Sequence, residues 1–158
     1  MYSAGSSTRY RNAGDAKHNH LGLSHAILQC PLWIVYIQHN NLSAGTRTFK
    51  PGTRGAELVP ELNIVSDHIF TKVKSNALTS ETFSAFIQER GISEFYVVGA
   101  DAAACIKSTC YNMTKSGYTV HVLSDCITSY DKRKLPELLT YYVSKGCEVL
   151  ELSEVVKR

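Results

Sequence analysis

Cys105 is the residue whose type and position most clearly indicate chemistry. It follows a run of small side chains, GADAAA at positions 99–104, that joins an apolar segment to an amphipathic one. The N–H groups of a first helical turn are free and point outward, and the positive end of the helix dipole favours a thiolate. The same N–H groups can stabilise an oxyanion. The pattern indicates sulfur attack on a carbonyl carbon; the alternative is a buried structural cysteine at a helix start.

Lys72 is the second candidate, because it directly follows the short apolar segment 68–71. A lysine after a strand is normally a solvated charge. At the carboxyl edge of a parallel sheet, however, it can lie beside a thiol and keep that thiol ionised. Lys74 stands only two residues further on and could be mistaken for the candidate, so the spacing from the strand end matters.

The other cysteines indicate neither a disulfide framework nor a zinc ribbon. The five cysteines stand at 30, 105, 110, 126 and 147, without a Cys-x-x-Cys pair. In a reducing compartment they are free thiols, and we expect the four besides Cys105 to be small buried hydrophobes.

Strand-like and helix-like segments alternate along most of the chain. Apolar runs predict strands at 32–37, 68–71, 95–98, 118–123 and 147–150. Helical spacing predicts three helices. The first begins near Thr79 and ends at Gly91, the second buries one face of 106–113, and the third carries an apolar stripe over 135–143. The long segment 38–66 is expected to be a loop that forms a wall or lid of a site. The alternation predicts a parallel sheet flanked by helices, with the site at the carboxyl ends of the strands.

Length and composition predict one packed domain. The chain has 158 residues, 44% hydrophobic and 20% charged, which excludes collagen-like, coiled-coil and disordered classes. A net charge of +3 from scattered basic residues argues against nucleic-acid binding. No apolar run approaches the roughly 20 residues of a membrane span, and the polar start lacks a signal sequence, so we expect a cytoplasmic protein. We expect a flexible polar tail over 1–23 and an α/β domain over 24–158.

Four segments in register resemble one family, the isochorismatase-like cysteine hydrolases, which include nicotinamidases and carbamoyl-amide hydrolases. The resemblance runs from Leu32 to about Leu152. Positions 99–109 look like the nucleophile motif, with a Gly six residues before the Cys and a Thr four after it. Thr71-Lys72 resembles the lysine motif, although Leu78 stands where the family has an aromatic residue. Positions 49–58 resemble the Gly/Pro loop before the lysine strand, and 117–126 the strand that follows the nucleophile helix.

The resemblance implies a three-layer α/β/α fold of Rossmann type and a Cys-Lys-Asp hydrolase. Cys105 would attack a small amide through a thioester-type intermediate, with Lys72 as its partner and no cofactor. A non-proline cis peptide would fall at Ala100–Asp101, and the turn, with Ala104, would aim N–H groups at an oxyanion. Family members commonly form oligomers, so a homo-oligomer is expected.

The third catalytic residue of the family has no match. That Asp closes an apolar strand near the N-terminus, and no such strand precedes Pro31; Asp15 follows no apolar run and is not assigned the role. The missing strand is a central one, so its neighbours would lose backbone partners. The tail can rearrange to fill the gap, another chain can fill it, or the chain is a truncated product. Asp101 is a candidate acid near Cys105, although a solvent-facing turn residue is the favoured interpretation.

We expect no metal site. Some nicotinamidases bind zinc through Asp-x-His and a further His, and His39 has neither partner, while His18 and His20 lie in the polar tail. His39 and Leu78 are expected as pocket-wall residues instead. The leading hypothesis is thus a cysteine hydrolase of a small amide. The rivals are a catalytically impaired relative that acts as a binding or assembly module, and a redox-responsive thiol protein.

Overall fold

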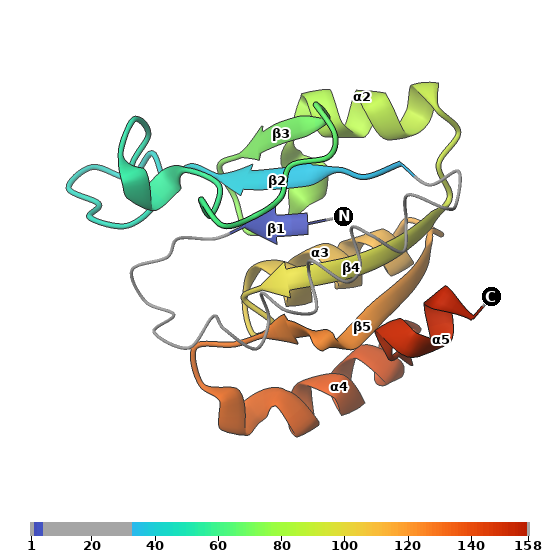
Figure 1. Ribbon diagram of the computed structural model, residues 1–158. Helices are drawn as coiled ribbons and strands as arrows, with labels where there is room; N and C mark the ends of the chain where they lie inside the picture. The colour runs from blue at the N-terminus through green and yellow to red at the C-terminus, as the bar shows by residue number, and fades with distance from the viewer. Residues whose placement is uncertain (1, 5–32, 158) are drawn as a thin grey trace.

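A single parallel sheet organises the protein. The computed structural model describes residues 2–4 and 33–157. In this part of the chain, six strands form one sheet in the order β3-β2-β1-β4-β5-β6, and every neighbouring pair is parallel (Figure 1). The strands are β1 (Tyr2–Ala4), β2 (Tyr36–His39), β3 (Ile69–Lys72), β4 (Glu94–Ala100), β5 (Thr119–Thr128) and β6 (Glu148–Leu150). The parallel α/β fold predicted from the alternation is confirmed.

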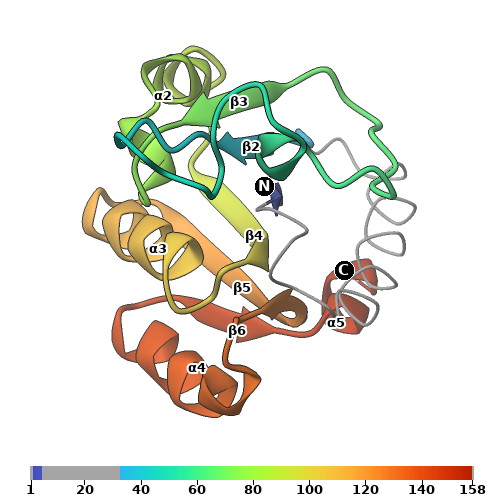
Figure 2. The same cartoon turned by 90° about the vertical axis from the view of Figure 1, so that its left-hand side faces the viewer.

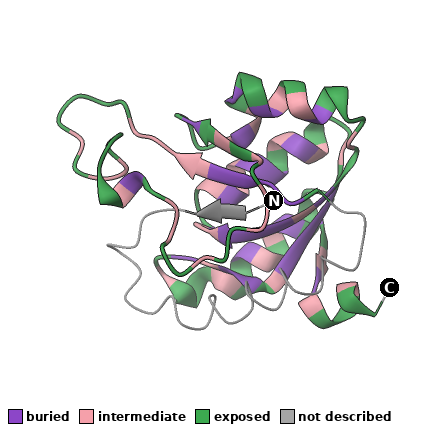
Figure 3. Ribbon diagram, turned by 45° about the horizontal axis from the view of Figure 1, so that its top comes forward, coloured by how far each residue is buried: buried purple, intermediate pink, exposed green. Residues whose placement is uncertain are grey.

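Helices lie on both faces of the sheet. One face is covered by α2 (Glu81–Glu89), α3 (Cys105–Lys115) and α4 (Leu135–Ser144), and α5 (Leu152–Val156) lies against the other (Figure 2). Three short 3-10 helices complete the described elements, namely η1 (Arg54–Ala56), η2 (Ala77–Thr79) and η3 (Lys132–Lys134). The larger core fills the space between the sheet and α2, α3 and α4, and the buried residues follow the middle of the strands (Figure 3).

Helix α3, which begins at Cys105, forms as its spacing predicts. Ile106, Thr109, Cys110 and Met113 are its buried residues, so they share the face that packs on the sheet. The helix ends before Gly117, whose φ of 86° is open to glycine without a steric penalty. The N–H of Tyr118 then returns to the carbonyl of Met113 at 3.1 Å. This end leads the chain directly into β5.

A short strand near the N-terminus occupies the central position, which agrees with the account in which the tail fills the gap. The backbone of β1 pairs with β2 on one side and with β4 on the other. Tyr2–Ala4, at the start of the predicted tail, is therefore a strand of the sheet, and the rest of the predicted tail lies outside the described residues. The sequence has no apolar run at this strand, because a central strand is also stabilised by backbone hydrogen bonds on both sides, which no side-chain pattern records.

Other boundaries differ by a few residues. The strand expected to start at Leu32 starts at Tyr36, although Ile34 and Val35 are buried. The reason is that β1 and β3 offer partners to only a short part of this segment. Helix α2 has Ser80 as its N-cap residue, and Thr79 belongs to the preceding η2 turn.

Candidate active site

Three side chains that can do chemistry converge at the carboxyl ends of the strands. Lys72 is the last residue of β3, and His39 is the last residue of β2, directly paired with it in the sheet register. Cys105 is the first residue of α3, which follows β4. The strand order reverses between β1 and β4, and open α/β sheets bind ligands at such a point.

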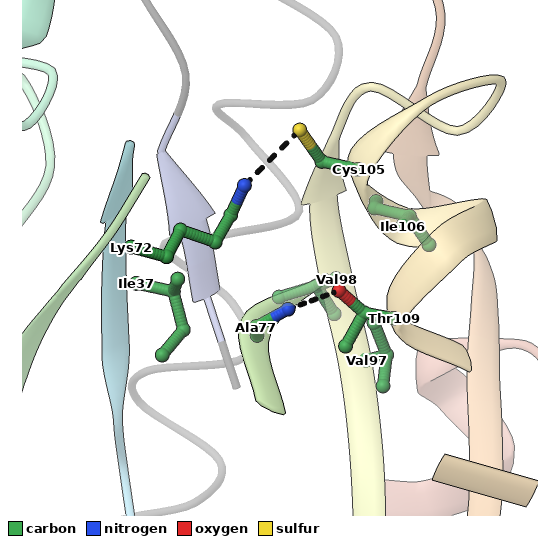
Figure 4. A pocket seen from close by; sticks show the side chains of 8 residues that line it. All are labelled: Ile37, Lys72, Ala77, Val97, Val98, Cys105, Ile106 and Thr109. Carbon is green, nitrogen blue, oxygen red and sulfur yellow. Dashed lines mark hydrogen bonds between the residues drawn. The ribbon is translucent and has the colours of Figure 1, made fainter. Parts of the chain in front are cut away.

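The amine of Lys72 lies against the sulfur of Cys105. Nζ and Sγ are 3.2 Å apart (Figure 4). Lys72 is only 2% exposed, whereas Cys105 is partly exposed. The other cysteines within the described part, Cys110, Cys126 and Cys147, are buried, as expected, and Cys30 lies outside it. Cys105 is therefore the accessible thiol of the described part of the chain.

Lys72 makes three polar contacts, and none of them is with a carboxylate in the described part of the chain. Besides the sulfur, Nζ donates to the carbonyl of Lys74 at 2.9 Å and lies 3.2 Å from Nδ1 of His39. These contacts match the three N–H donors of an ammonium group. Burial lowers the pKa of Lys72, and the neighbouring Cys105 acts in the opposite direction.

His39 is a partner of Lys72, a closer role than the pocket wall that we expected. Burial and the charge of Lys72 lower the pKa of His39 to about 4. The imidazole is therefore neutral near pH 7, and Nδ1 acts as an acceptor when the ring proton is on Nε2. The ring of Phe49, from the long loop after β2, packs edge-on against it at 5.0 Å between centroids. The loop thus contacts the site through Phe49.

The turn before Cys105 is held by Asp101. The peptide bond Ala100–Asp101 is cis, as the resemblance implied. The carboxylate of Asp101 accepts hydrogen bonds from the N–H of Ala103 at 2.7 Å and from the hydroxyl of Ser129 at 2.8 Å. Asp101 therefore ties the turn to the segment after β5, whereas the favoured interpretation from the sequence was a turn residue that faces solvent.

The backbone N–H groups of the turn differ in their availability. Ala104, expected to take part in an oxyanion site, donates to the carbonyl of Asp101 at 3.1 Å, and Ala102 donates to Thr128 at 2.9 Å. Ile106 donates to the same Asp101 carbonyl at 3.0 Å. The N–H of Cys105 has no acceptor among the described residues. It is therefore the donor that remains free beside the sulfur.

Lys72 and Cys105 are among the residues that line a small apolar cavity. Its volume is about 10 Å³, room for one water molecule. It is lined by Ile37, Lys72, Ala77, Val97, Val98, Cys105, Ile106 and Thr109 (Figure 4). Leu78, expected at a pocket wall, does not line it. Leu78 packs against the main core instead, because η2 places Ala77 at the cavity.

Thr109 is a residue of the site that the role assignments from sequence missed. Its buried hydroxyl accepts a hydrogen bond from the N–H of Ala77 at 3.0 Å and contacts the carbonyl of Ser75 at 3.4 Å. The loop that follows Lys72 is thereby fastened to the helix that begins with Cys105. The signal was present as the Thr four residues after the Cys, but its partner is 32 residues away in the chain.

Neither a metal-binding cluster nor a membrane-spanning helix occurs among the described residues. Among residues 2–4 and 33–157, no group of three or more His, Cys, Asp or Glu side chains is arranged to hold a metal ion. His18 and His20 lie outside these residues. No helix in the described ranges is long and apolar enough to span a bilayer.

Several solved structures share the fold of this chain. The fold is similar to an isochorismatase-like hydrolase from Alkaliphilus metalliredigens, with TM-score 0.84, 17% identity, and 99% of this chain and 96% of the other covered. It is also similar to a nicotinamidase from Bacillus subtilis, with TM-score 0.80, 15% identity, and 95% and 98% covered.

Sequence comparison reaches the same group of proteins. A protein of Arabidopsis thaliana named "Probable inactive nicotinamidase" is 29% identical over 94 residues, 58% of this chain. The match spans 48% of that relative, about half of its length. The family model described as the isochorismatase domain matches residues 24–154. Most of the chain is thus covered by one family model, and the protein belongs to the isochorismatase family.

Proposed function

We propose that the protein is a cysteine hydrolase that cleaves the C–N bond of a small amide, with Cys105 as nucleophile and Lys72 as its acid–base partner. The observation that carries the proposal is the 3.2 Å contact between Nζ and Sγ at the carboxyl edge of the sheet. An ammonium group at this distance favours the thiolate, which is the nucleophilic form of cysteine. Membership of the isochorismatase family and the fold shared with a nicotinamidase support an amide as the substrate.

The first half of the reaction forms a thioester. The thiolate of Cys105 adds to the amide carbonyl carbon, and the resulting oxyanion accepts a hydrogen bond from the free N–H of Cys105 at the start of α3. The leaving nitrogen needs a proton as the C–N bond breaks. Lys72, adjacent to the sulfur, donates this proton and becomes a neutral amine. The amine or ammonia then leaves.

The second half of the reaction releases the acid. The neutral amine of Lys72 takes a proton from a water molecule as the water oxygen adds to the thioester carbonyl. The C–S bond then breaks, which returns the thiolate of Cys105, while Lys72 is again an ammonium. Burial lowers the pKa of Lys72 and so makes it a better acid in the first half than an exposed lysine.

A second candidate is a catalytically impaired family member that binds a small molecule or assembles with a partner. The observation in its favour is that β1, with the sequence YSA, contains no carboxylate, and none contacts Lys72 within the described residues. The Arabidopsis relative is itself named inactive. The two candidates differ in whether the Cys–Lys pair turns over a substrate.

The experiment that separates them is ammonia release from a panel of small primary amides, measured with the wild type and with Cys105→Ala. Alkylation of Cys105 by iodoacetamide is followed in the same preparations. Ammonia release that Cys105→Ala abolishes supports the hydrolase. An alkylation-competent thiol without turnover of any amide overturns it and leaves binding or thiol redox chemistry, and an inert Cys105 leaves binding alone. A matched control, Cys126→Ala, removes a buried cysteine and is expected to retain activity.

The oligomeric state and the cellular location of the protein stay predictions. Assembly as a homo-oligomer is checked by sedimentation velocity of the full chain, where a single monomeric species would contradict it. A cytoplasmic location is checked by fractionation of the source cells.

A further inference from the structure

His39 and Lys72 are placed side by side by the backbone itself. They are the paired terminal residues of two neighbouring parallel strands, so their side chains leave the sheet at the same level. The N–H of Asn40 also donates to the carbonyl of Lys72 at 2.8 Å, which extends the pairing past the strand end. The 3.2 Å contact between Nδ1 of His39 and Nζ of Lys72 is therefore built into the sheet register.

Each N–H donor of the Lys72 ammonium group has an acceptor only when His39 is one of the acceptors. An ammonium group has three N–H donors, and three atoms surround Nζ: the sulfur of Cys105, the carbonyl of Lys74 and Nδ1 of His39. A protonated imidazole would place a second N–H donor and a second positive charge against the amine. Burial and Lys72 lower the pKa of His39 to about 4, which keeps the ring neutral at the pH of most cells.

We propose that His39 is a positioning residue for Lys72, and that its Nδ1 supplies the hydrogen-bond acceptor that a carboxylate on the first strand would otherwise provide. The proposal deepens the proposed hydrolase and rests on it for the role of Lys72. The described part of β1 is YSA and offers no acidic side chain, whereas β2 brings the imidazole to the amine.

A neutral acceptor has a chemical consequence that a carboxylate would not have. A carboxylate next to Lys72 would stabilise the ammonium by charge and hold its proton more tightly. The imidazole orients the ammonium through one hydrogen bond and adds no negative charge, so Lys72 keeps its lowered pKa and can release its proton to the leaving nitrogen. Among the described residues, the site thus has an oriented acid without a carboxylate beside it.

Two substitutions separate the hydrogen bond from the rest of the side chain. In His39→Asn the amide oxygen reaches about the position of Nδ1 and keeps an acceptor for Lys72. In His39→Leu the acceptor is lost while most of the volume that packs against Phe49 is retained. The rate of Cys105 alkylation by iodoacetamide is measured from pH 5.5 to 10 on the full chain, with mass spectrometry of the peptide that contains Cys105.

We expect His39→Leu to slow alkylation at pH 7 by about tenfold, the effect of one hydrogen bond to a charged group, and to move the midpoint of the pH profile upward. His39→Asn should stay within about twofold of the wild type, on the basis of the same retained acceptor. The titratable groups in these contacts are His39 on β2, Lys72 on β3 and Cys105 on α3. The pH profile of Cys105 alkylation therefore reports on the ionisation of these three side chains.

Two outcomes would overturn the proposal. Alkylation of His39→Leu at the wild-type rate would show that Lys72 needs no acceptor there. Equal slowing in both variants, with urea unfolding curves like that of the wild type, would show that the imidazole ring matters and not the hydrogen bond. Alkylation requires no amide turnover, so the positioning role can be confirmed even when the hydrolase proposal fails.

Discussion

Lys72 combines two properties that rarely occur together, because it is 2% exposed and has no carboxylate partner among the described residues. Placing an ammonium group in such surroundings destabilises the folded protein unless hydrogen bonds compensate. Three acceptors surround the amine, and one of them is the sulfur of Cys105. A functional role therefore explains the buried Lys72 better than a contribution to the stability of the fold does.

Replacement of Lys72 by methionine should separate these two properties. We expect Lys72→Met to raise the free energy of unfolding by on the order of 1 kcal/mol, because an apolar side chain replaces a buried ionisable one. The same change should slow Cys105 alkylation at pH 7 at least tenfold. Lys74→Met is the matched control, since only the backbone carbonyl of the exposed Lys74 takes part in the site. A lowered free energy of unfolding in urea for Lys72→Met would contradict this view.

His39 should contribute a pH dependence to stability. Its pKa is about 4 in the folded protein and near 6.5 in the unfolded chain. Between these values the unfolded chain binds a proton that the folded protein does not, so the free energy of unfolding falls as the pH falls from about 6.5 to 4.

We expect this loss to be smaller in His39→Asn by about 1 kcal/mol, after an allowance for solvent screening of a half-buried ring. The measurement is urea unfolding at several pH values between 4 and 7. His68 and His121 are present in both proteins and cancel in the difference. Parallel pH profiles for the two proteins would show that His39 titrates alike in the folded and unfolded states.

At the scale of elements, the site depends on how α3 is fastened to the loop after β3. The hydroxyl of Thr109 accepts a hydrogen bond from the N–H of Ala77, and both residues are buried. This bond joins the helix that carries Cys105 to the segment that follows Lys72. We therefore expect its loss to change how closely the sulfur and the amine approach each other.

Thr109→Val removes the hydroxyl at nearly constant volume and leaves the N–H of Ala77 buried without an acceptor. We expect a loss of about 1–3 kcal/mol in the free energy of unfolding and slower alkylation of Cys105. Thr109→Ser keeps the hydroxyl and should retain the alkylation rate. The prediction fails when Thr109→Val alkylates as fast as Thr109→Ser.

The turn between β4 and α3 depends on Asp101. Asp101 accepts hydrogen bonds from Ala103 and Ser129, so its oxygens are engaged in holding the turn. We expect Asp101→Asn, which keeps an acceptor oxygen, to hydrolyse amides at a rate close to that of the wild type. Asp101→Ala should instead be less stable by about 1–2 kcal/mol in thermal unfolding. Loss of ammonia release in a stable Asp101→Asn protein would assign an acid role to Asp101.

At the scale of the whole molecule, β1 determines whether the sheet is continuous. It is only three residues long, but it pairs with β2 and β4, which belong to the two halves of the sheet. Without it, the strand that positions His39 and the strand that leads to Cys105 would lose their common neighbour. The short strand therefore supports the geometry of the site from a distance.

A proline in β1 tests this dependence. Ser3 faces Ile37 on one side and Gly99 on the other, and proline cannot donate a ladder hydrogen bond in a central strand. We expect Ser3→Pro to lower the free energy of unfolding by about 1–3 kcal/mol, because a ladder hydrogen bond is lost and its acceptor is left unpaired, while Ser3→Ala has little effect. Hydrogen exchange of the β2 and β4 amides should be faster in Ser3→Pro. Unchanged exchange would mean that the sheet does not depend on this strand.

The sequence alone predicted the alternation of strands and helices, the buried face of α3 and the two residues Cys105 and Lys72. These features depend on local periodicity, on turn residues and on short motifs, which are all readable within about ten residues. Helix α5, the N-cap of α2 and the start of β2 were missed or displaced, because their limits depend on which partners the neighbouring segments provide.

Only the tertiary structure brought His39 to Lys72, Thr109 to Ala77 and Asp101 to Ser129, contacts that span 33, 32 and 28 residues in the chain. It alone placed Tyr2–Ala4 in the middle of the sheet. The physical reason is that strand register and backbone hydrogen bonds act between segments far apart in the sequence, whereas a residue pattern records only the burial of its own side chains. The sequence identified the candidate reacting groups, and the register of the sheet determined their neighbours.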